Sequence, residues 1–141
     1  MLIWFLLITL SHAYHTTDEI FQKIQHECDT VAQLTCTMHK DIMVVDWNAH
    51  LPRDIVWSYN EHAREKITGE LALKSIQAFR HSKPTRRITV VPILNVWGRK
   101  MVERGKRCLR KNRMGVDTNR NFPTRYKLSL IHISEPTRLG M

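Results

Sequence analysis

One pair of residues in this sequence has the types and the spacing of a metal site: His62 and Glu65, in the run HARE. The pair directly follows DIVWSY (residues 54–59), a run typical of a β-strand. An imidazole and a carboxylate three residues apart at the end of a strand can converge on one side of the chain, and both bind zinc. The spacing therefore predicts half of a zinc site. A second such pair, His132 and Glu135, lies in the unusual tail discussed below, and we assign it no function.

Further motifs follow the first pair in a fixed order: VVPILN, then LRKN, then GVDTNRNFP. Together with NEHARE, and with the opening segment from Tyr14 to Ile20, they resemble the zinc metallocarboxypeptidases of the carboxypeptidase A and B type. The resemblance runs from Tyr14 to about Tyr126. It implies the N-terminal part of a zinc-dependent hydrolase that releases C-terminal amino acids from peptides by metal-activated water.

The same resemblance implies a role for several residues. Its metal ligands are His62 and Glu65, its catalytic residue is Arg110, and its substrate-binding residues are Arg64, Asn119 and Arg120. Zinc in such a site lowers the pKa of a bound water and polarises the scissile carbonyl. A positive charge at Arg110 would favour the tetrahedral transition state. The guanidinium of Arg120 can hold a terminal carboxylate in bidentate geometry, which would restrict the activity to C-terminal ends.

The third zinc ligand of the family, a histidine, comes well downstream of the NRN motif, as do a tyrosine that closes over substrate and a glutamate that acts as general base. We expect no native residue of this chain to fill these roles. His81, the histidines upstream of His62, and Cys108 could in principle complete a zinc shell, but we expect each to be structural or exposed. Two ligands bind zinc weakly, and a site without a base lacks a proton acceptor. We therefore expect this polypeptide to be inactive, although its parent is an enzyme.

A second hypothesis fits the same motifs. A secreted, non-catalytic relative could bind peptide C-termini through Asn119 and Arg120 without turnover. Two departures from the family also lie beside the ligands. The run NVWG at residues 95–98 stands where many members have Asn-Pro-Asp-Gly, and Lys66 stands where a tryptophan is common. We expect substrate preference to differ accordingly.

The formal net charge of +9 raises the question of a nucleic-acid partner. Residues 99–125 contain ten Lys or Arg and two Asp or Glu, a net +8, so this one stretch holds nearly the whole imbalance. Arg110 and Arg120 account for part of it, and a solvated face explains Lys100, Arg104, Lys106 and Arg107. A small nucleic-acid module would leave the ordered motifs unexplained. We expect peptide or protein C-termini as the partner, no nucleic acid, no stable membrane insertion, and a monomer.

Hydrophobic periodicity predicts an α/β arrangement around these motifs. A capping box at Thr16 predicts a helix whose stripe is Ile20, Phe21, Ile24, Cys28 and Val31. Strands are predicted over residues 35–39, 42–47 and 54–59, with a turn at residues 40–41. A second helix from about Thr68 has the stripe Leu71, Ala72, Ser75, Ile76 and Phe79, and ends before Pro84. Residues 88–95 predict a central strand with Pro92 near its end or at a bulge. The expected fold is a partial mixed, mainly parallel sheet flanked by helices, as in the zinc carboxypeptidases.

Three segments define the expected domain organisation: a signal peptide (residues 1–13), the N-terminal part of a peptidase domain (residues 14–127) and a non-native tail (residues 128–141). The apolar run of residues 2–10 is too short to span a bilayer and precedes small residues suited to signal peptidase, which predicts secretion. A buried N-terminal strand or helix is the alternative. The tail contains LSLIHISEPTR, which resembles a translated sequencing-library adapter; the alternative is a genuine strand and turn.

The chain has three cysteines, Cys28, Cys36 and Cys108, without a C-x-x-C metal motif. An odd number leaves one thiol unpaired in an oxidising compartment. A bridge between Cys28 and Cys36 is one arrangement, and three buried reduced cysteines are the other.

Overall fold

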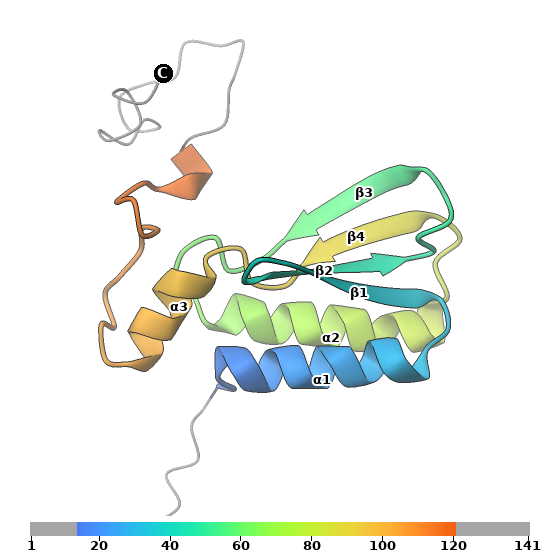
Figure 1. Cartoon of the computed structure of the whole chain (residues 1–141), viewed down its shortest axis with the longest axis horizontal. Coiled ribbons are helices and arrows are strands. Elements are labelled where there is room, and N and C mark those ends of the chain that lie inside the picture. Colours follow the sequence, from blue (N-terminus) through green and yellow to red (C-terminus); the bar gives the residue numbers. More distant parts are fainter. Residues whose placement is uncertain (1–13, 121–141) are drawn as a thin grey trace, which may run out of the picture.

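The computed structural model of this chain describes residues 14–120 and shows a layer of helices against a mixed sheet (Figure 1). In chain order the elements are α1 (Thr17–Thr30), β1 (Leu34–His39), β2 (Ile42–Trp47), β3 (Arg53–Ser58), α2 (Ile67–Ser82), β4 (Arg87–Val91), α3 (Val96–Glu103) and the 3-10 helix η1 (Thr118–Arg120). The predicted α/β class is confirmed. Predicted elements at residues 1–13 and in the tail from residue 128 lie outside the described residues.

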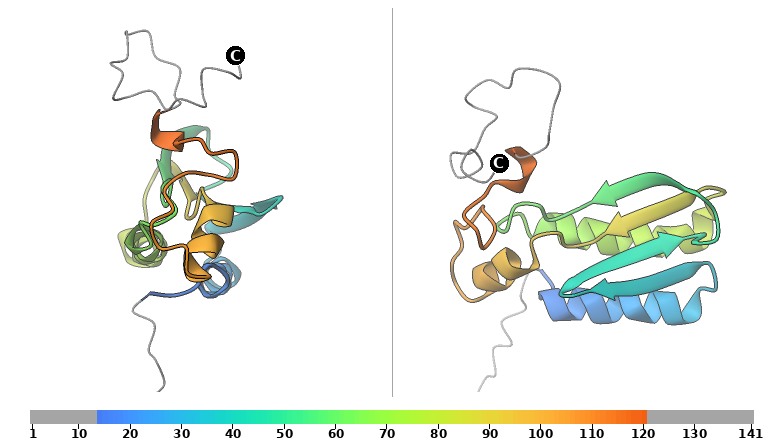
Figure 2. Two further views of the ribbon diagram at one scale, coloured as in Figure 1. Left: turned by 90° about the vertical axis from the view of Figure 1, so that its left-hand side faces the viewer. Right: turned by 45° about the horizontal axis from the view of Figure 1, so that its top comes forward.

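The sheet has four strands in the order β1-β2-β4-β3. β1 pairs antiparallel with β2, β2 pairs antiparallel with β4, and β3 pairs parallel with β4. In the described part of the chain, the parallel pairing is thus between β3 and β4, with α2 as their crossover. α1 and α2 lie side by side on one face of this sheet, as both views in Figure 2 show. Their buried stripes and the inward side chains of β2 and β4 form the core.

α1 begins with the capping box that the sequence predicts. The Thr16 side chain accepts a hydrogen bond from the Glu19 backbone N–H, while the Glu19 carboxylate accepts one from the Thr16 N–H, so the capping box is complete. Ile20 and Ile24 are fully buried, which contributes about 1.5–3 kcal/mol each to stability. At the other end of α1, Cys28 forms a disulfide with Cys36 of β1.

The structure decides between the two cysteine arrangements that the sequence left open. The Cys28–Cys36 bridge joins α1 to β1 across eight residues, and Cys108 is a free, exposed cysteine. The alternative of three buried reduced cysteines is therefore wrong.

Two predictions for the helices need correction. Leu71 was expected on the buried stripe of α2, but its side chain is 55% exposed, and the stripe runs through Gly69, Ala72, Leu73, Ile76 and Phe79. The second correction concerns α3, a helix that the hydrophobic periodicity did not reveal. That helix begins because the Asn95 side chain accepts a hydrogen bond from the Gly98 N–H, which caps its first turn.

The strands β3 and β4 point toward the same end of the molecule, where α3 and the segment leading to η1 also lie (Figure 1). In open α/β sheets, sites form beyond the carboxyl ends of parallel strands. This end of the sheet therefore positions the chemistry predicted from the sequence. None of the helices within residues 14–120 is long and apolar enough to cross a bilayer.

Candidate metal and substrate site

The turn after β3 carries the predicted metal ligands. Near the start of this turn, Asn60 has a positive φ of 51°, and its carbonyl accepts a hydrogen bond from the Asn95 N–H at 3.1 Å. Asparagine adopts this left-handed conformation more readily than most residues, so the chain can turn sharply out of the strand. Further along the turn, the Ala63 N–H donates to the Arg110 carbonyl at 3.1 Å. The turn is thereby tied to the segment after β4 and to the LRKN motif.

His62 is buried, with 6% of its surface exposed, and lies between two carboxylates. Its Nδ1 is 2.9 Å from Oε1 and 3.0 Å from Oε2 of Glu65. Its Nε2 is 3.1 Å from Oδ1 of Asp117. The predicted ligands His62 and Glu65 thus converge, as their spacing suggested. Because the Asp117 carboxylate can only accept a hydrogen bond, the bond to Asp117 requires a proton on Nε2.

The pair His62 and Glu65 fits one half of a zinc site. A nitrogen lone pair and a carboxylate oxygen facing each other at 2.9 Å repel unless a positive ion, a proton or a metal, lies between them. Zinc lies about 2.0–2.2 Å from His and carboxylate donors, so a pair of tetrahedral ligands has donor atoms about 3.4 Å apart. A small opening of the present arrangement would admit the ion. Between residues 14 and 120, no group of three His, Cys, Asp or Glu side chains could hold a metal.

Asp117 is a site residue that sequence reasoning missed. Burial alone would raise the pKa of this carboxyl, but hydrogen bonds from Arg110 and His62, and their charges, outweigh it and lower the pKa. The carboxylate is therefore ionised at neutral pH. Metal-binding histidines commonly donate their other ring N–H to a carboxylate, which fixes the tautomer and orients the ring. The signal was available in GVDTNRNFP, where Asp117 is the motif's acidic residue.

Arg110 lies beside both carboxylates. Its Nε donates to Oδ2 of Asp117 at 2.7 Å, and its Nη1 is 3.5 Å from Oε1 of Glu65. The Arg110 side chain is about one quarter exposed. The predicted catalytic arginine thus lies next to the predicted ligands.

Asn119 and Arg120 follow in η1. The Asn119 N–H donates to Oδ1 of Asp117, and the Arg120 N–H donates to the Asp117 carbonyl. These bonds hold the backbone of the two predicted carboxylate-binding residues against Asp117, the residue that also contacts His62. The Arg120 guanidinium bonds the Asn119 carbonyl at 3.0 Å.

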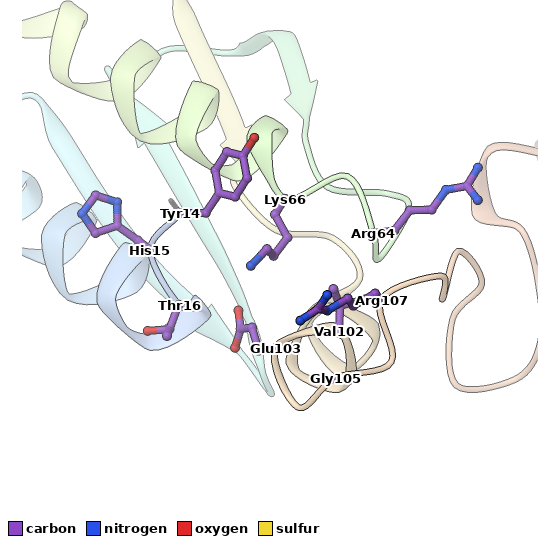
Figure 3. A pocket seen from close by; sticks show the side chains of 9 residues that line it. All are labelled: Tyr14, His15, Thr16, Arg64, Lys66, Val102, Glu103, Gly105 and Arg107. Carbon is purple, nitrogen blue, oxygen red and sulfur yellow. The ribbon is translucent and has the colours of Figure 1, made fainter. Parts of the chain in front are cut away.

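Arg64 is not brought together with the other predicted residues. It lines a separate cavity of about 650 Å³, together with Tyr14, Lys66 and Arg107 among others. Figure 3 shows its guanidinium extending away from Tyr14 and Lys66, from the turn that carries the ligands. None of the residues that line this cavity is His62, Glu65, Arg110 or Asp117.

Asn95 and Gly98, the first and last residues of the run NVWG, also support the site, although no role was predicted for them from the sequence. The Asn95 side chain donates to the carbonyls of Glu61 and Lys111, at 3.3 and 3.2 Å. A Cβ at Gly98 would lie 2.6 Å from Asn95 Oδ1 and 2.7 Å from Ala63 Cβ. Only glycine fits there, because α3 packs directly against the ligand turn.

Comparison with solved structures gives the fold at low sequence identity. Bovine thrombin-activatable fibrinolysis inhibitor, in complex with tick carboxypeptidase inhibitor, superposes with a TM-score of 0.68 at 21% identity, covering 79% of this chain and 44% of that protein. Carboxypeptidase A from Helicoverpa armigera gives 0.66 at 22%, covering 80% and 34%. A metallopeptidase from Shewanella amazonensis gives 0.59 at 15%, covering 86% and 47%. This chain therefore spans less than half the length of these proteins.

Sequence comparison adds the family. No curated protein sequence matches this chain. The family model for zinc carboxypeptidases matches residues 41–138, which include both predicted ligands, the LRKN and NRN motifs, and part of the segment that we expect to be non-native. The match covers more than half of the sequence and agrees with the fold of the solved structures. The chain belongs to the zinc carboxypeptidase family.

Proposed function

We propose that this chain supplies two zinc ligands and the carboxylate-binding residues of a metallocarboxypeptidase that releases C-terminal amino acids from peptides. One observation carries the proposal: His62 Nδ1 and the Glu65 carboxylate face each other at 2.9 Å, while the other ring nitrogen is held by Asp117. With its lone pair on Nδ1, the ring would call for a positive ion, a proton or a metal, between that atom and the Glu65 carboxylate. The family membership favours zinc as that cation.

The residues divide the chemistry as follows. Zinc, when bound, activates water and polarises the scissile carbonyl. His62 and Glu65 hold the ion, and Asp117 keeps the proton on Nε2 so that Nδ1 presents its lone pair. Arg110 supplies a positive charge next to the ligands, at the place where an oxyanion would need stabilisation.

Substrate recognition is assigned to η1 and the ligand turn. Asn119 and Arg120 bind the terminal carboxylate of a peptide, and Arg64 contacts substrate. The third ligand, a histidine, and the general base come from outside residues 14–120. The disulfide between Cys28 and Cys36 supports an oxidising compartment, and with the apolar N-terminal run it supports secretion.

Zinc titration of the 141-residue chain tests the ligand pair. We expect weak, saturable binding in calorimetry, with Co²⁺ absorption bands when cobalt replaces zinc. His62→Ala or Glu65→Gln should each lower the affinity at least about tenfold, because each removes one of the two ligands. His81→Ala is the matched control, since His81 is an exposed histidine of α2. Equal affinity of the wild-type chain and both ligand variants would contradict the proposal.

A further inference from the structure

Arg99 is the largest side chain that the described fold buries completely, with none of its surface exposed. A buried guanidinium is costly unless its donors are paired. Its Nη1 donates to Asn60 Oδ1 at 2.6 Å and to the Lys66 carbonyl at 2.8 Å. Its Nη2 donates to the His15 carbonyl at 2.8 Å, and its Nε lies 3.3 Å from the Glu103 carboxylate. One side chain thus joins the segment before α1, the turn after β3, the start of α2 and α3.

Asn60 connects Arg99 to His62, the predicted metal ligand. Its side chain is buried, and its Nδ2 donates to the His62 carbonyl at 2.8 Å. The two ends of the amide therefore have opposite partners: Oδ1 must face the donors of Arg99, and Nδ2 must face the His62 carbonyl. This fixes the orientation of the amide. Two hydrogen bonds in series connect the guanidinium to the backbone of His62.

Gly69 of α2 shows how closely the guanidinium is enclosed. A Cβ at this position would lie 2.9 Å from Arg99 Nη1 and 3.3 Å from Arg99 Cζ. The absence of a side chain at Gly69 lets the first turn of α2 approach the guanidinium, so its carbonyl partner at Lys66 is within reach. Arg99 therefore has little freedom to move, and the amide of Asn60 is held against a fixed donor.

We propose that Arg99 is a positioning residue that, through Asn60, fixes the His62 backbone and so sets the imidazole between Asp117 and Glu65. Arg99 touches neither the ligand atoms nor Asp117. The relevance of this device to zinc rests on the proposed function, but its effect on the ring is measurable without metal. The same guanidinium also ties the His15 carbonyl to the ligand turn.

Nuclear magnetic resonance of the metal-free full chain tests the proposal. The measured quantity is the rate at which the His62 Nε2 proton, which is hydrogen-bonded to Asp117, exchanges with water. Arg99→Met should accelerate this exchange about tenfold, the equivalent of one lost hydrogen bond. Asn60→Gly keeps the positive φ but removes the link, so it should have the same effect. The double variant should be no worse than either single variant, because both interrupt one path.

Arg87→Met is the matched control. Arg87 is a partly buried arginine that, like Arg99, lies beside a carboxylate, here Asp46, but it lies in β4 away from the ligand turn. It should lower stability and leave the His62 exchange unchanged. The Trp47 indole N–H, which donates to the Pro84 carbonyl at 2.7 Å, reports that the fold is retained.

The outcomes separate this proposal from the proposed function. Unchanged His62 exchange in folded Asn60→Gly, or additive effects in the double variant, would overturn the positioning role. If Arg99→Met does not fold, Asn60→Gly alone decides. A chain that binds no zinc, yet shows the coupled loss of ring protection, would overturn the proposed metal site and leave the positioning role standing.

Discussion

At the scale of single residues, Asp117 connects the candidate ligands to the candidate substrate residues. It accepts hydrogen bonds from the His62 ring, from Arg110 and from the Asn119 N–H. Its side chain is about 10% exposed, so these bonds replace water rather than compete with it. A carboxylate in this position orients the ring and balances the arginine beside it.

Asp117→Asn tests this role with little change in shape. The amide oxygen can still accept from His62, but the negative charge that holds Arg110 is lost. We expect zinc affinity to fall about 10–100-fold, as for other carboxylates behind a metal-binding histidine. We expect the free energy of unfolding to fall by about 1–3 kcal/mol. Calorimetry and urea unfolding measure the two effects.

The control for this substitution is Asp18→Asn in the first turn of α1. Asp18 pairs with Lys100, but its side chain is 72% exposed, so the change should cost less than about 1 kcal/mol and leave zinc affinity unaltered. A similar loss of affinity in both variants would point to a general charge effect and against a role for Asp117.

At the scale of elements, Asp46 of β2 joins the antiparallel pair β2 and β4. Arg87 donates two hydrogen bonds to its carboxylate, at 3.1 and 2.9 Å, and the Thr89 hydroxyl donates another. Burial alone would raise the pKa of Asp46. The hydrogen bonds from Arg87 and Thr89 and the charges of Arg87 and Arg53 outweigh it, so the pKa is lowered.

A lowered carboxyl pKa gives a definite sign to the dependence of stability on pH. The ionised form is favoured in the folded state, so its contribution is present above the ordinary Asp pKa of 3.8 and is lost as pH falls through the folded value. Asp46→Asn should therefore destabilise the chain at pH 7 and change little at strongly acidic pH. Urea unfolding across the acid range measures this. A constant difference between the two chains at every pH would contradict the assignment.

At the scale of the whole molecule, β3 lies at one edge of the described sheet, with β4 as its neighbour there. Val56 and Trp57 of β3 are 58% and 38% exposed. An exposed edge with large apolar side chains is a template for pairing with another chain. The solved structures of which this chain covers less than half have further sequence available to cover such an edge.

From the sequence we expect a monomer for the parent enzyme; for the isolated 141-residue chain we instead expect self-association as its concentration rises, and we expect Val56→Lys to reduce that association. A charge on an edge strand opposes strand pairing. Leu71→Lys is the control, because Leu71 is similarly exposed but lies on α2. Sedimentation velocity over a range of concentrations measures the effect. A wild-type chain that stays monomeric at every concentration would show that the β3 edge does not pair with another chain.

Features that depend on contacts between residues close in the sequence could be predicted, whereas features that depend on contacts between distant residues could not. The β1–β2 hairpin and the capped start of α1 were predictable because neighbouring residues decide them. The contact between His62 and Glu65 was predictable for the same reason. Asp117 was missed because its partner lies 55 residues away, and Arg99 because a charge in a basic stretch is usually solvated. Only tertiary contacts decide such cases.

The position of β4 between β2 and β3 also sets an order of folding. Residues of the β1–β2 hairpin meet across a two-residue turn, whereas Val45 must find Val90 much later in the chain. Closing that long loop costs more chain entropy and slows the step. The turn after β3, Asn95 and α3 meet when β4 docks, so most of this chain must have left the ribosome before these contacts can hold the turn in place.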